Sequence, residues 1–191
     1  MSRRPERIAA GRRDRSDDEA DVPGGEDPGV LVRLEAYDHP AAQALVAAMI
    51  VDIEERYAGD EGADDPEAEW AISVDEVTPP RGVFLVAYRG GQPLGCGALR
   101  PLPAAGTHVA EIKRMYTAPA ARRRGVSRVV LARLESEAVS LGYGRLQLET
   151  GLRQPEAMAL YETSGYHRIP IYGMYAGSEL SACFAKDIPG G

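Results

Sequence analysis

The 191-residue sequence predicts one α/β (α+β) domain, a mixed and mostly antiparallel sheet of about six to seven strands with helices on both faces. A hydrophobic content of 44% is enough to build a core in a chain of this length. Short segments of alternating apolar residues predict strands, and longer segments with apolar residues at helical spacing predict helices. Their order, hairpin strands followed by strand, helix, strand, helix, strand, favours this fold class.

The first 28 residues differ in composition from the rest of the chain. They are rich in Arg, Asp, Glu, Gly and Pro and offer little for a core to bury, so we expect residues 1–28 to form a disordered charged tail. The domain itself is then residues 29–188. The early arginines suggest a nucleic-acid-binding arm, but the acids that follow them and the net charge of −7 oppose that interpretation. We therefore expect no nucleic acid partner.

The N-terminal half of the domain is expected to supply strands and one helix. The predicted strands are 30–35, 83–88, 93–99 and 109–116. Asp38-His-Pro opens a helix, and its apolar face consists of Leu45, Val46, Met49, Ile50 and Ile53. Between the second and third strands, Arg89-Gly-Gly-Gln92 predicts a tight hairpin.

The C-terminal half alternates helices with strands. A helix beginning at Gly125 carries apolar residues at helical spacing and ends at Gly142, and its apolar positions are Val126, Val130, Leu134, Ala138 and Leu141. A strand over 145–150 leads to a second helix, which has Pro155 in its first turn and Gly165 past its end. Strands over 166–171 and 181–186 enclose a loop rich in Gly and Tyr.

The strand over 109–116 has no cleanly apolar face. One face carries Val109, Glu111, Lys113 and Met115, and the other carries Ala110, Ile112, Arg114 and Tyr116. This pattern is anomalous for a strand that packs in a core.

Other features limit the location and chemistry of the protein. No apolar run is long enough to span a bilayer, and the start of the chain lacks an apolar stretch of signal-peptide type, so we expect a cytoplasmic protein with no membrane partner. Cys96 and Cys183 are expected to be buried, reduced thiols. His39, His108 and His167 show no metal-ligand spacing, so we expect no metal.

An arginine-rich segment precedes the helix that begins at Gly125. The first turn of a helix leaves backbone N–H groups without partners and carries part of the macrodipole's positive charge. Arg124, Gly125, Val126 and Ser127 can therefore surround a pyrophosphate. The pattern is neither a Walker A loop nor a dinucleotide-binding Gly-x-Gly-x-x-Gly, and a solvated basic turn is the alternative interpretation of Arg122, Arg123 and Arg124.

This loop resembles the coenzyme A loop of the GNAT superfamily of acyl-CoA-dependent N-acetyltransferases, Gln/Arg-x-x-Gly-x-Gly/Ala. Arg122, Gly125 and Ser127 occupy its three defined places, although Ser127 replaces the usual Gly or Ala. The stretch from Gln154 to Tyr166 resembles a second GNAT motif, Asn-x-x-Ala-x-x-Leu-Tyr-x-x-x-Gly-Phe. Its matching residues are Ala157, Leu160, Tyr161 and Gly165, while Gln154 replaces Asn and Tyr166 replaces Phe.

The resemblance covers roughly residues 30 to 187 and implies a fold and an acyl donor. A GNAT sheet splays between its fourth and fifth strands, here 109–116 and 145–150, and the pantetheine arm of acetyl-CoA enters that wedge. The residues that the resemblance and the loop assign to acetyl-CoA binding are Met115, Tyr116, Thr117, Arg122, Arg123, Arg124, Gly125, Val126, Ser127 and Gln154.

The resemblance also implies catalytic residues. Glu111 matches the place of a catalytic Glu and would accept the amine's proton through a water molecule. Glu149 is the reserve base. Backbone N–H groups near Met115 would hold the thioester oxygen. Tyr161 matches a Tyr beside the cofactor sulfur and would protonate or hydrogen-bond the thiolate. Each of these residues also has a non-catalytic interpretation. Glu111 would be a surface carboxylate paired with Lys113 or Arg114. Glu149 would be an exposed strand residue, and Tyr161 a core aromatic.

The acceptor is expected to be a primary amine of a small molecule or peptide. An acidic stretch that includes Asp60, Glu61, Asp64 and Asp65 favours a cationic amine, and a solvated acidic loop is its alternative. Tyr172 and Tyr175 are expected to wall the acceptor cleft or pack beside it. Three alternative functions remain: an acyl-CoA-binding module without turnover, a protein N-terminal or lysine acetyltransferase, and a nucleotide-binding protein. The sequence leaves open whether the protein is a monomer or a homodimer.

Overall fold

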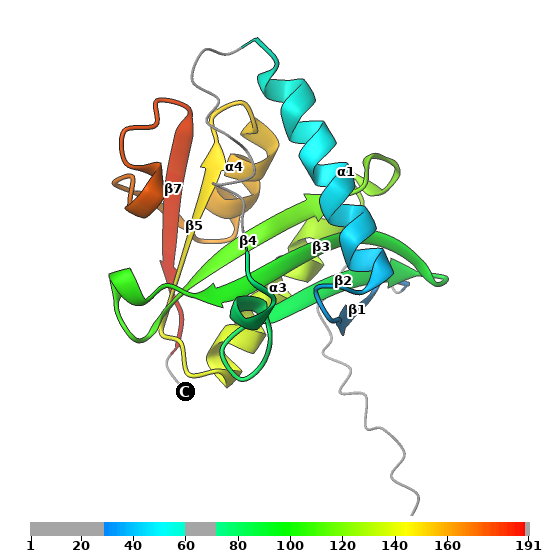
Figure 1. Ribbon diagram of the computed structural model, residues 1–191, viewed down its shortest axis with the longest axis horizontal. Helices are drawn as coiled ribbons and strands as arrows, with labels where there is room; N and C mark the ends of the chain where they lie inside the picture. Colours follow the sequence, from blue (N-terminus) through cyan, green and yellow to red (C-terminus); the bar gives the residue numbers. More distant parts are fainter. Residues whose placement is uncertain (1–28, 60–71, 190–191) are drawn as a thin grey trace, which may run out of the picture.

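The computed structural model describes residues 29–59 and 72–189. These residues form a single domain around one seven-stranded sheet that has α-helices on both faces (Figure 1). The predicted fold class is confirmed. The predicted tail, residues 1–28, and the acidic stretch from Asp60 to Glu69 lie outside the described residues. No helix in the described parts of the chain is long and apolar enough to cross a membrane.

The secondary structure follows the predicted order. The strands are β1 (Leu31–Leu34), β2 (Val83–Arg89), β3 (Gln92–Pro101), β4 (Val109–Thr117), β5 (Arg145–Gly151), β6 (His167–Ile169) and β7 (Ser181–Asp187). The α-helices are α1 (Pro40–Tyr57), α3 (Val126–Ser140) and α4 (Pro155–Thr163). In space the strands run β1-β2-β3-β4-β5-β7-β6, and β4 with β5 is the parallel pair among otherwise antiparallel neighbours.

Local sequence signals explain where elements begin and end. His39 caps α1, because its Nδ1 accepts a hydrogen bond from the N–H of Ala41 at 3.2 Å. Gly90 and Gly91 both have positive φ, 56° and 79°, as a tight turn between β2 and β3 requires. At the end of α3, Gly142 has a φ of 83° and the N–H of Tyr143 bonds back to the carbonyl of Ala138, which terminates the helix.

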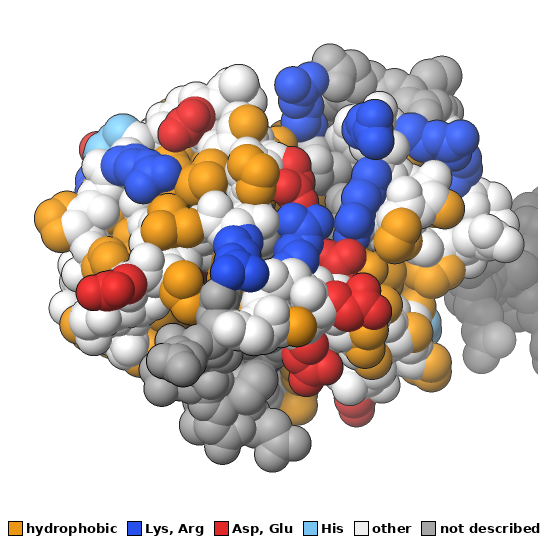
Figure 2. Space-filling model, turned by 90° about the horizontal axis from the view of Figure 1, so that it is seen from above, with side chains coloured by type: hydrophobic (Ala, Val, Ile, Leu, Met, Phe, Trp, Pro, Cys, Tyr) orange, Lys and Arg blue, Asp and Glu red, His pale blue; other side chains and the backbone are white. Residues whose placement is uncertain are grey.

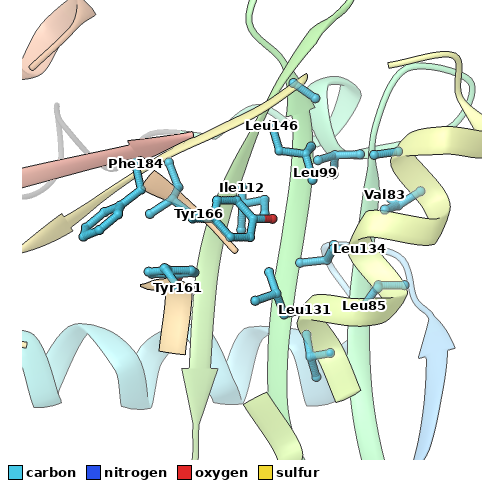
Figure 3. Close-up of a cluster of buried hydrophobic side chains, with 14 of the residues drawn as sticks. Val83, Leu85, Leu99, Ile112, Leu131, Leu134, Leu146, Tyr161, Tyr166 and Phe184 are labelled. Carbon is cyan, nitrogen blue, oxygen red and sulfur yellow. The ribbon is translucent and has the colours of Figure 1, made fainter. Parts of the chain in front are cut away.

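Two hydrophobic clusters cover the two faces of the sheet. On the face that carries α3, here called the α3 face, Val83 and Leu85 of β2 pack with Leu131 and Leu134 of the helix (Figure 3). The opposite face, here called the α1 face, packs alternate residues of β2 such as Phe84 against α1. Burial from both sides explains why β2 is an unbroken apolar run rather than an alternating one.

The sheet splits between β4 and β5. These strands pair over only three positions, from Val109 opposite Arg145 to Glu111 opposite Gln147. Beyond them β4 continues along β3 while β5 continues along β7, and the two strands diverge in Figure 1. The predicted splay between the fourth and fifth strands is therefore confirmed.

A bulge in β4 changes which face its last residues occupy. The pairing with β3 shifts between Cys96 and Ala98, and Arg114 lies at the shift with a φ of 58°. As a result Met115 packs on the α3 face and Tyr116 on the α1 face. The prediction that Met115 shares a face with Glu111 is wrong, because strict alternation does not survive an extra residue.

Candidate active site

A cleft of about 910 Å³ lies between the segment leading into α3, helix α4 and the C-terminal half of α1. It is lined by every residue that the sequence assigned to cofactor binding, namely Met115, Tyr116, Thr117, Arg122, Arg123, Arg124, Gly125, Val126, Ser127 and Gln154. Tyr161 lines it as well. The structure thus brings together residues from two motifs that are about thirty positions apart in the sequence.

The start of α3 is built to receive an anion. Gly125 caps the helix in the left-handed conformation, with a φ of 78°, where a side chain would be strained. The N–H groups of Val126 and Ser127 have no acceptor within the helix. Arg123 and Arg124 are exposed at the same place. These groups fit the phosphates of an acyl-CoA.

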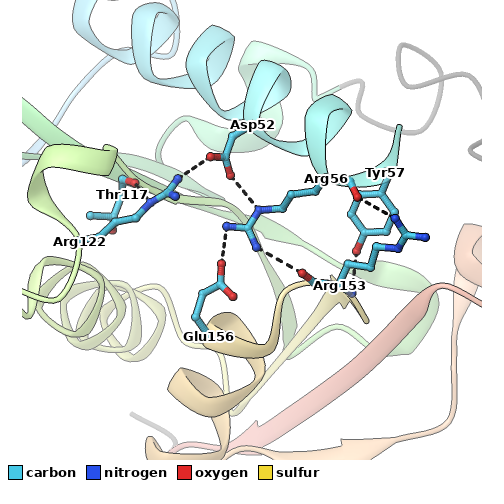
Figure 4. Close-up of polar contacts among 7 residues, drawn as sticks. All are labelled: Asp52, Arg56, Tyr57, Thr117, Arg122, Arg153 and Glu156. Atoms are coloured by element: carbon cyan, nitrogen blue, oxygen red, sulfur yellow. Dashed lines mark hydrogen bonds and ion pairs between the residues drawn. The ribbon is translucent and has the colours of Figure 1, made fainter. Parts of the chain in front are cut away.

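Arg122 has a different environment from its two neighbours. Its Nε donates to the carbonyl of Thr117 at 3.1 Å, and its Nη2 lies 2.7 Å from the Oδ1 of Asp52 in α1 (Figure 4). Burial raises the pKa of Asp52, but hydrogen bonds and charges from Arg122 and Arg56 outweigh it and hold the pKa below its usual value. Arg122 therefore fastens the loop to α1.

A second set of contacts fastens α1 to α4. Arg56 contacts Asp52 at 3.1 Å and Glu156 at 2.5 Å, and its Nη1 donates to the carbonyl of Arg153 (Figure 4). The N–H of Arg153 in turn donates to the hydroxyl of Tyr57. Sequence analysis did not assign Asp52, Arg56 or Glu156 to the cleft, although all three line it. The signal that was present is the acid and base four positions apart on α1, Asp52 and Arg56.

Charged side chains of both signs crowd this end of the molecule. Figure 2 shows basic side chains close together on the face seen from above Figure 1, with acidic side chains among them. Figure 4 shows two ion pairs beside the cleft, that of Arg122 with Asp52 and that of Arg56 with Glu156. The cleft therefore offers fixed positive groups whose positions are held by carboxylates.

Glu111 lies on the α1 face beside the split and is fully buried. Its Oε2 accepts from Nε and Nη2 of Arg100, each at 2.7 Å. Its Oε1 accepts from the hydroxyls of Tyr172 and Tyr175 at 2.9 and 3.3 Å. A carboxylate has about four acceptor positions, so these four donors occupy the group.

Lys113 follows on the same face of β4. Its ammonium donates to the hydroxyl of Tyr175 and lies 5.1 Å from the centre of that ring. Burial lowers the pKa of Lys113 and the charge of Arg100 lowers it further, while Glu111 and Glu149 raise it. Tyr175 therefore connects Lys113 to Glu111 through one hydroxyl group.

Glu149 lies on β5, across the split. Its neighbours Leu148 and Thr150 are buried, and Leu148 belongs to the core on the α3 face, so Glu149 is directed to the α1 face. Its Oε1 accepts from the hydroxyl of Ser181 at 2.6 Å, and its side chain is only partly buried.

Tyr161 is a buried residue of α4 that packs at an edge-to-face angle on Tyr166 and near Phe184 (Figure 3). Burial raises its pKa, and the nearby charge of Glu149 raises it further. Tyr161 thus holds its proton firmly and suits hydrogen bonding better than proton donation. No three His, Cys, Asp or Glu side chains among the described residues could hold a metal ion together.

A sheet split beside a glycine-capped helix, with a cleft at the opening, is the arrangement expected of an acyl-CoA-dependent transferase. The chain belongs to the GNAT acetyltransferase family, whose family model, "Acetyltransferase (GNAT) family", matches residues 47–166. It is 33% identical over 161 residues to an IAA acetyltransferase of Azospirillum brasilense, covering 84% of this chain and 99% of that one. It is also 34% identical over 125 residues to the uncharacterized N-acetyltransferase YsnE of Bacillus subtilis, covering 64% of this chain and 81% of that one.

Solved structures share the fold. A Klebsiella pneumoniae protein described as an acyl-CoA N-acyltransferase superposes with a TM-score of 0.66 at 26% identity, covering 83% of this chain and 97% of that one. A GNAT acetyltransferase of Elizabethkingia anophelis, with acetyl-CoA bound, gives a TM-score of 0.61 at 12% identity, covering 85% of this chain and all of that one, 100%. The second likeness concerns the fold alone.

Proposed function

We propose that this protein transfers the acetyl group of acetyl-CoA to the primary amine of a small molecule or peptide, by direct attack in a ternary complex. The observation that carries the proposal is the cleft at the start of α3, which Met115 and Tyr161 line beside the split in the sheet. The acyl donor and the amine would approach this opening from its two faces. Family membership supports the same reaction class.

Acetyl-CoA would bind with its phosphates at the start of α3. The N–H groups of Val126 and Ser127 and the exposed guanidinium groups of Arg123 and Arg124 supply hydrogen bonds and positive charge there. Arg122 would act indirectly, by holding the loop against Asp52. Bound acetyl-CoA supplies the activated acetyl group, and the protein supplies position, hydrogen bonds and a proton acceptor.

The amine must lose a proton before it can attack. A primary amine with a pKa of about 10.4 requires about 4 to 5 kcal/mol to deprotonate at pH 7. Of the two carboxylates predicted for this task, we favour Glu149, because it is partly exposed beside the split, while the four acceptor positions of Glu111 are occupied. Glu111 would instead fix the positions of Tyr172 and Tyr175.

Bond formation to the amine nitrogen precedes loss of coenzyme A. The nitrogen attacks the carbonyl carbon, and backbone N–H groups near Met115 would stabilise the negative charge on the oxygen. The carbon–sulfur bond then breaks, and the thiolate takes the second proton of the former ammonium group. Tyr161 would donate a hydrogen bond to the sulfur and keep its own proton, because its pKa is raised. The products are an acetylamide, free coenzyme A and one proton.

Mass spectrometry of an amine panel tests this proposal. The protein is incubated with acetyl-CoA and with amino acids, polyamines, peptides and simple alkylamines, and IAA is included because a relative carries that name. The expected result is an acetyl mass on at least one amine and release of free thiol. Release of thiol without acetylated product would contradict it, and binding of acetyl-CoA with no release would support an acyl-CoA-binding module instead.

A further inference from the structure

Lys113 and Glu149 are placed across the opening of the split. Glu111 and Gln147 are the last residues that pair β4 with β5. Two residues further along each strand, on the same face, come Lys113 and Glu149. Because the strands are parallel, these two positions advance together along the two strands that flank the split. Their charges act on each other, since Glu149 raises the pKa of Lys113.

Among the described residues, two carboxylates lie near Lys113, Glu111 and Glu149, but neither forms an ion pair with it. Glu111, the acid on the same strand, is already paired with Arg100. The Nε and Nη2 atoms of Arg100 each lie 2.7 Å from the Oε2 of Glu111. Within the described residues, Lys113 forms no ion pair and instead donates to the neutral hydroxyl of Tyr175. A partly buried ammonium with no carboxylate in contact costs free energy. Beside a reaction site, such a group is a candidate for binding an anion.

We propose that Lys113 binds a carboxylate of the acceptor, so that the substrate is an amine of the amino-acid type. This inference rests on the proposed function. The acceptor's carboxylate pairs with Lys113 on β4, and its ammonium group faces Glu149 on β5. Tyr175 fixes the position of the lysine's ammonium group through its hydroxyl group. Lys113 is then a specificity-determining residue, whereas Glu149 accepts the proton that the amine loses.

The chain offers a close control for a lysine substitution. It contains two lysines, Lys113 and Lys186. Lys186 lies on β7, and its Nζ is 2.9 Å from a carboxylate oxygen of Glu135 in α3, so it belongs to the α3 face. Lys113→Met and Lys186→Met therefore remove the same group from opposite faces of the sheet. Lys113→Arg retains the positive charge.

The test compares twenty amino acids with their amides. The Michaelis constant of the best amino acid is measured against that of its amide, which lacks the negative charge. Lys113→Met should raise the constant for the acid by about ten- to a hundredfold, the range for losing a charge-assisted hydrogen bond. The constants for the amide and for acetyl-CoA should change less than about twofold, kcat should fall less than KM rises, and Lys113→Arg should recover part of the loss.

Calorimetry in the presence of coenzyme A measures the same acid and amide without turnover. The acid should bind the parent and Lys186→Met alike and bind Lys113→Met more weakly, and the melting temperature of Lys113→Met should not fall below that of the parent. Equal loss for acid and amide, or a parent that does not favour the acid by either measurement, would overturn the inference. Acetylation of neutral amines alone would overturn it and leave the proposed function standing. If no amine is acetylated, the proposed function fails and calorimetry alone decides the inference.

Discussion

Arg100 on β3 and Glu111 on β4 are directly opposite each other in the sheet, and their side chains form a paired contact with two nitrogens 2.7 Å from one oxygen. Two tyrosine hydroxyls occupy the other carboxylate oxygen. Glu111 thus joins β3, β4 and the loop that contains Tyr172 and Tyr175. This arrangement suits a residue that positions others.

Glu111→Gln should therefore destabilise the fold. Arg100 would keep a charge in a site where its side chain is 14% exposed, with Glu76 at 3.6 Å as the remaining acid. Breaking a buried pair in this way costs about 3 to 5 kcal/mol. Urea unfolding measures the loss. The double variant Arg100→Met/Glu111→Gln should recover much of it, and a loss below about 1 kcal/mol for the single variant would show that the pair is not structurally important.

Glu149→Gln should lower turnover about a hundredfold or more at neutral pH, the range for losing a general base. The deficit should shrink as the pH approaches the amine's own pKa, because the amine then needs no base. Glu111→Gln should show a deficit that is independent of pH. Rate profiles from pH 7 to 10 distinguish the two carboxylates. A pH-dependent recovery in the Glu111 variant alone would return the role of base to Glu111.

Asp52 should link stability to acid pH. Its folded pKa is depressed, so its pairing contributes stability above the unfolded value of about 3.9 and loses it as the pH falls through the folded pKa. Asp52→Asn should lower the melting temperature at pH 6, and the difference from the parent should shrink below about pH 4. A constant difference from pH 3 to pH 6 would show that the carboxylate's charge does not matter.

The acidic stretch from Asp60 to Glu69 lies outside the described residues, and its predicted preference for cationic amines can be tested by kinetics. If it borders the acceptor cleft, amines with an additional positive charge should be favoured in low salt, and the preference should fall as ionic strength rises. Neutralising Asp60, Glu61, Asp64 and Asp65 together should raise the Michaelis constant of a dicationic amine. Because Lys113 favours a carboxylate-bearing acceptor, the same acceptor panel decides between the two preferences.

Periodic and local signals accounted for most of the fold. The apolar run of β2, the two glycines of the hairpin and the glycines at both ends of α3 act within a few residues of their positions. They can be interpreted without knowing the tertiary structure. The bulge at Arg114 was missed because neither glycine nor proline marks it, and it moved Met115 to the α3 face.

The side-chain network was beyond sequence reasoning for a different reason. The hydrogen-bond partners of Glu111 are Arg100, 11 positions away in the sequence, and Tyr172 and Tyr175, 61 and 64 positions away. Arg122 and Asp52 are 70 positions apart. Motifs placed Glu111 and Arg122 in the right region, but their partners depend on how distant segments pack.

Calorimetry of two glycine variants tests most directly whether acetyl-CoA binds at the start of α3, because it measures the affinity of each variant for acetyl-CoA. Gly125 and Gly142 stand at opposite ends of α3 with similar φ values, 78° and 83°, and Gly125 lines the cleft. Replacing either with Val should cost at least about 1 to 2 kcal/mol of stability. Parent and Gly142→Val should bind acetyl-CoA saturably, while Gly125→Val binds at least about tenfold more weakly. Equal affinity in all three proteins would contradict the assignment.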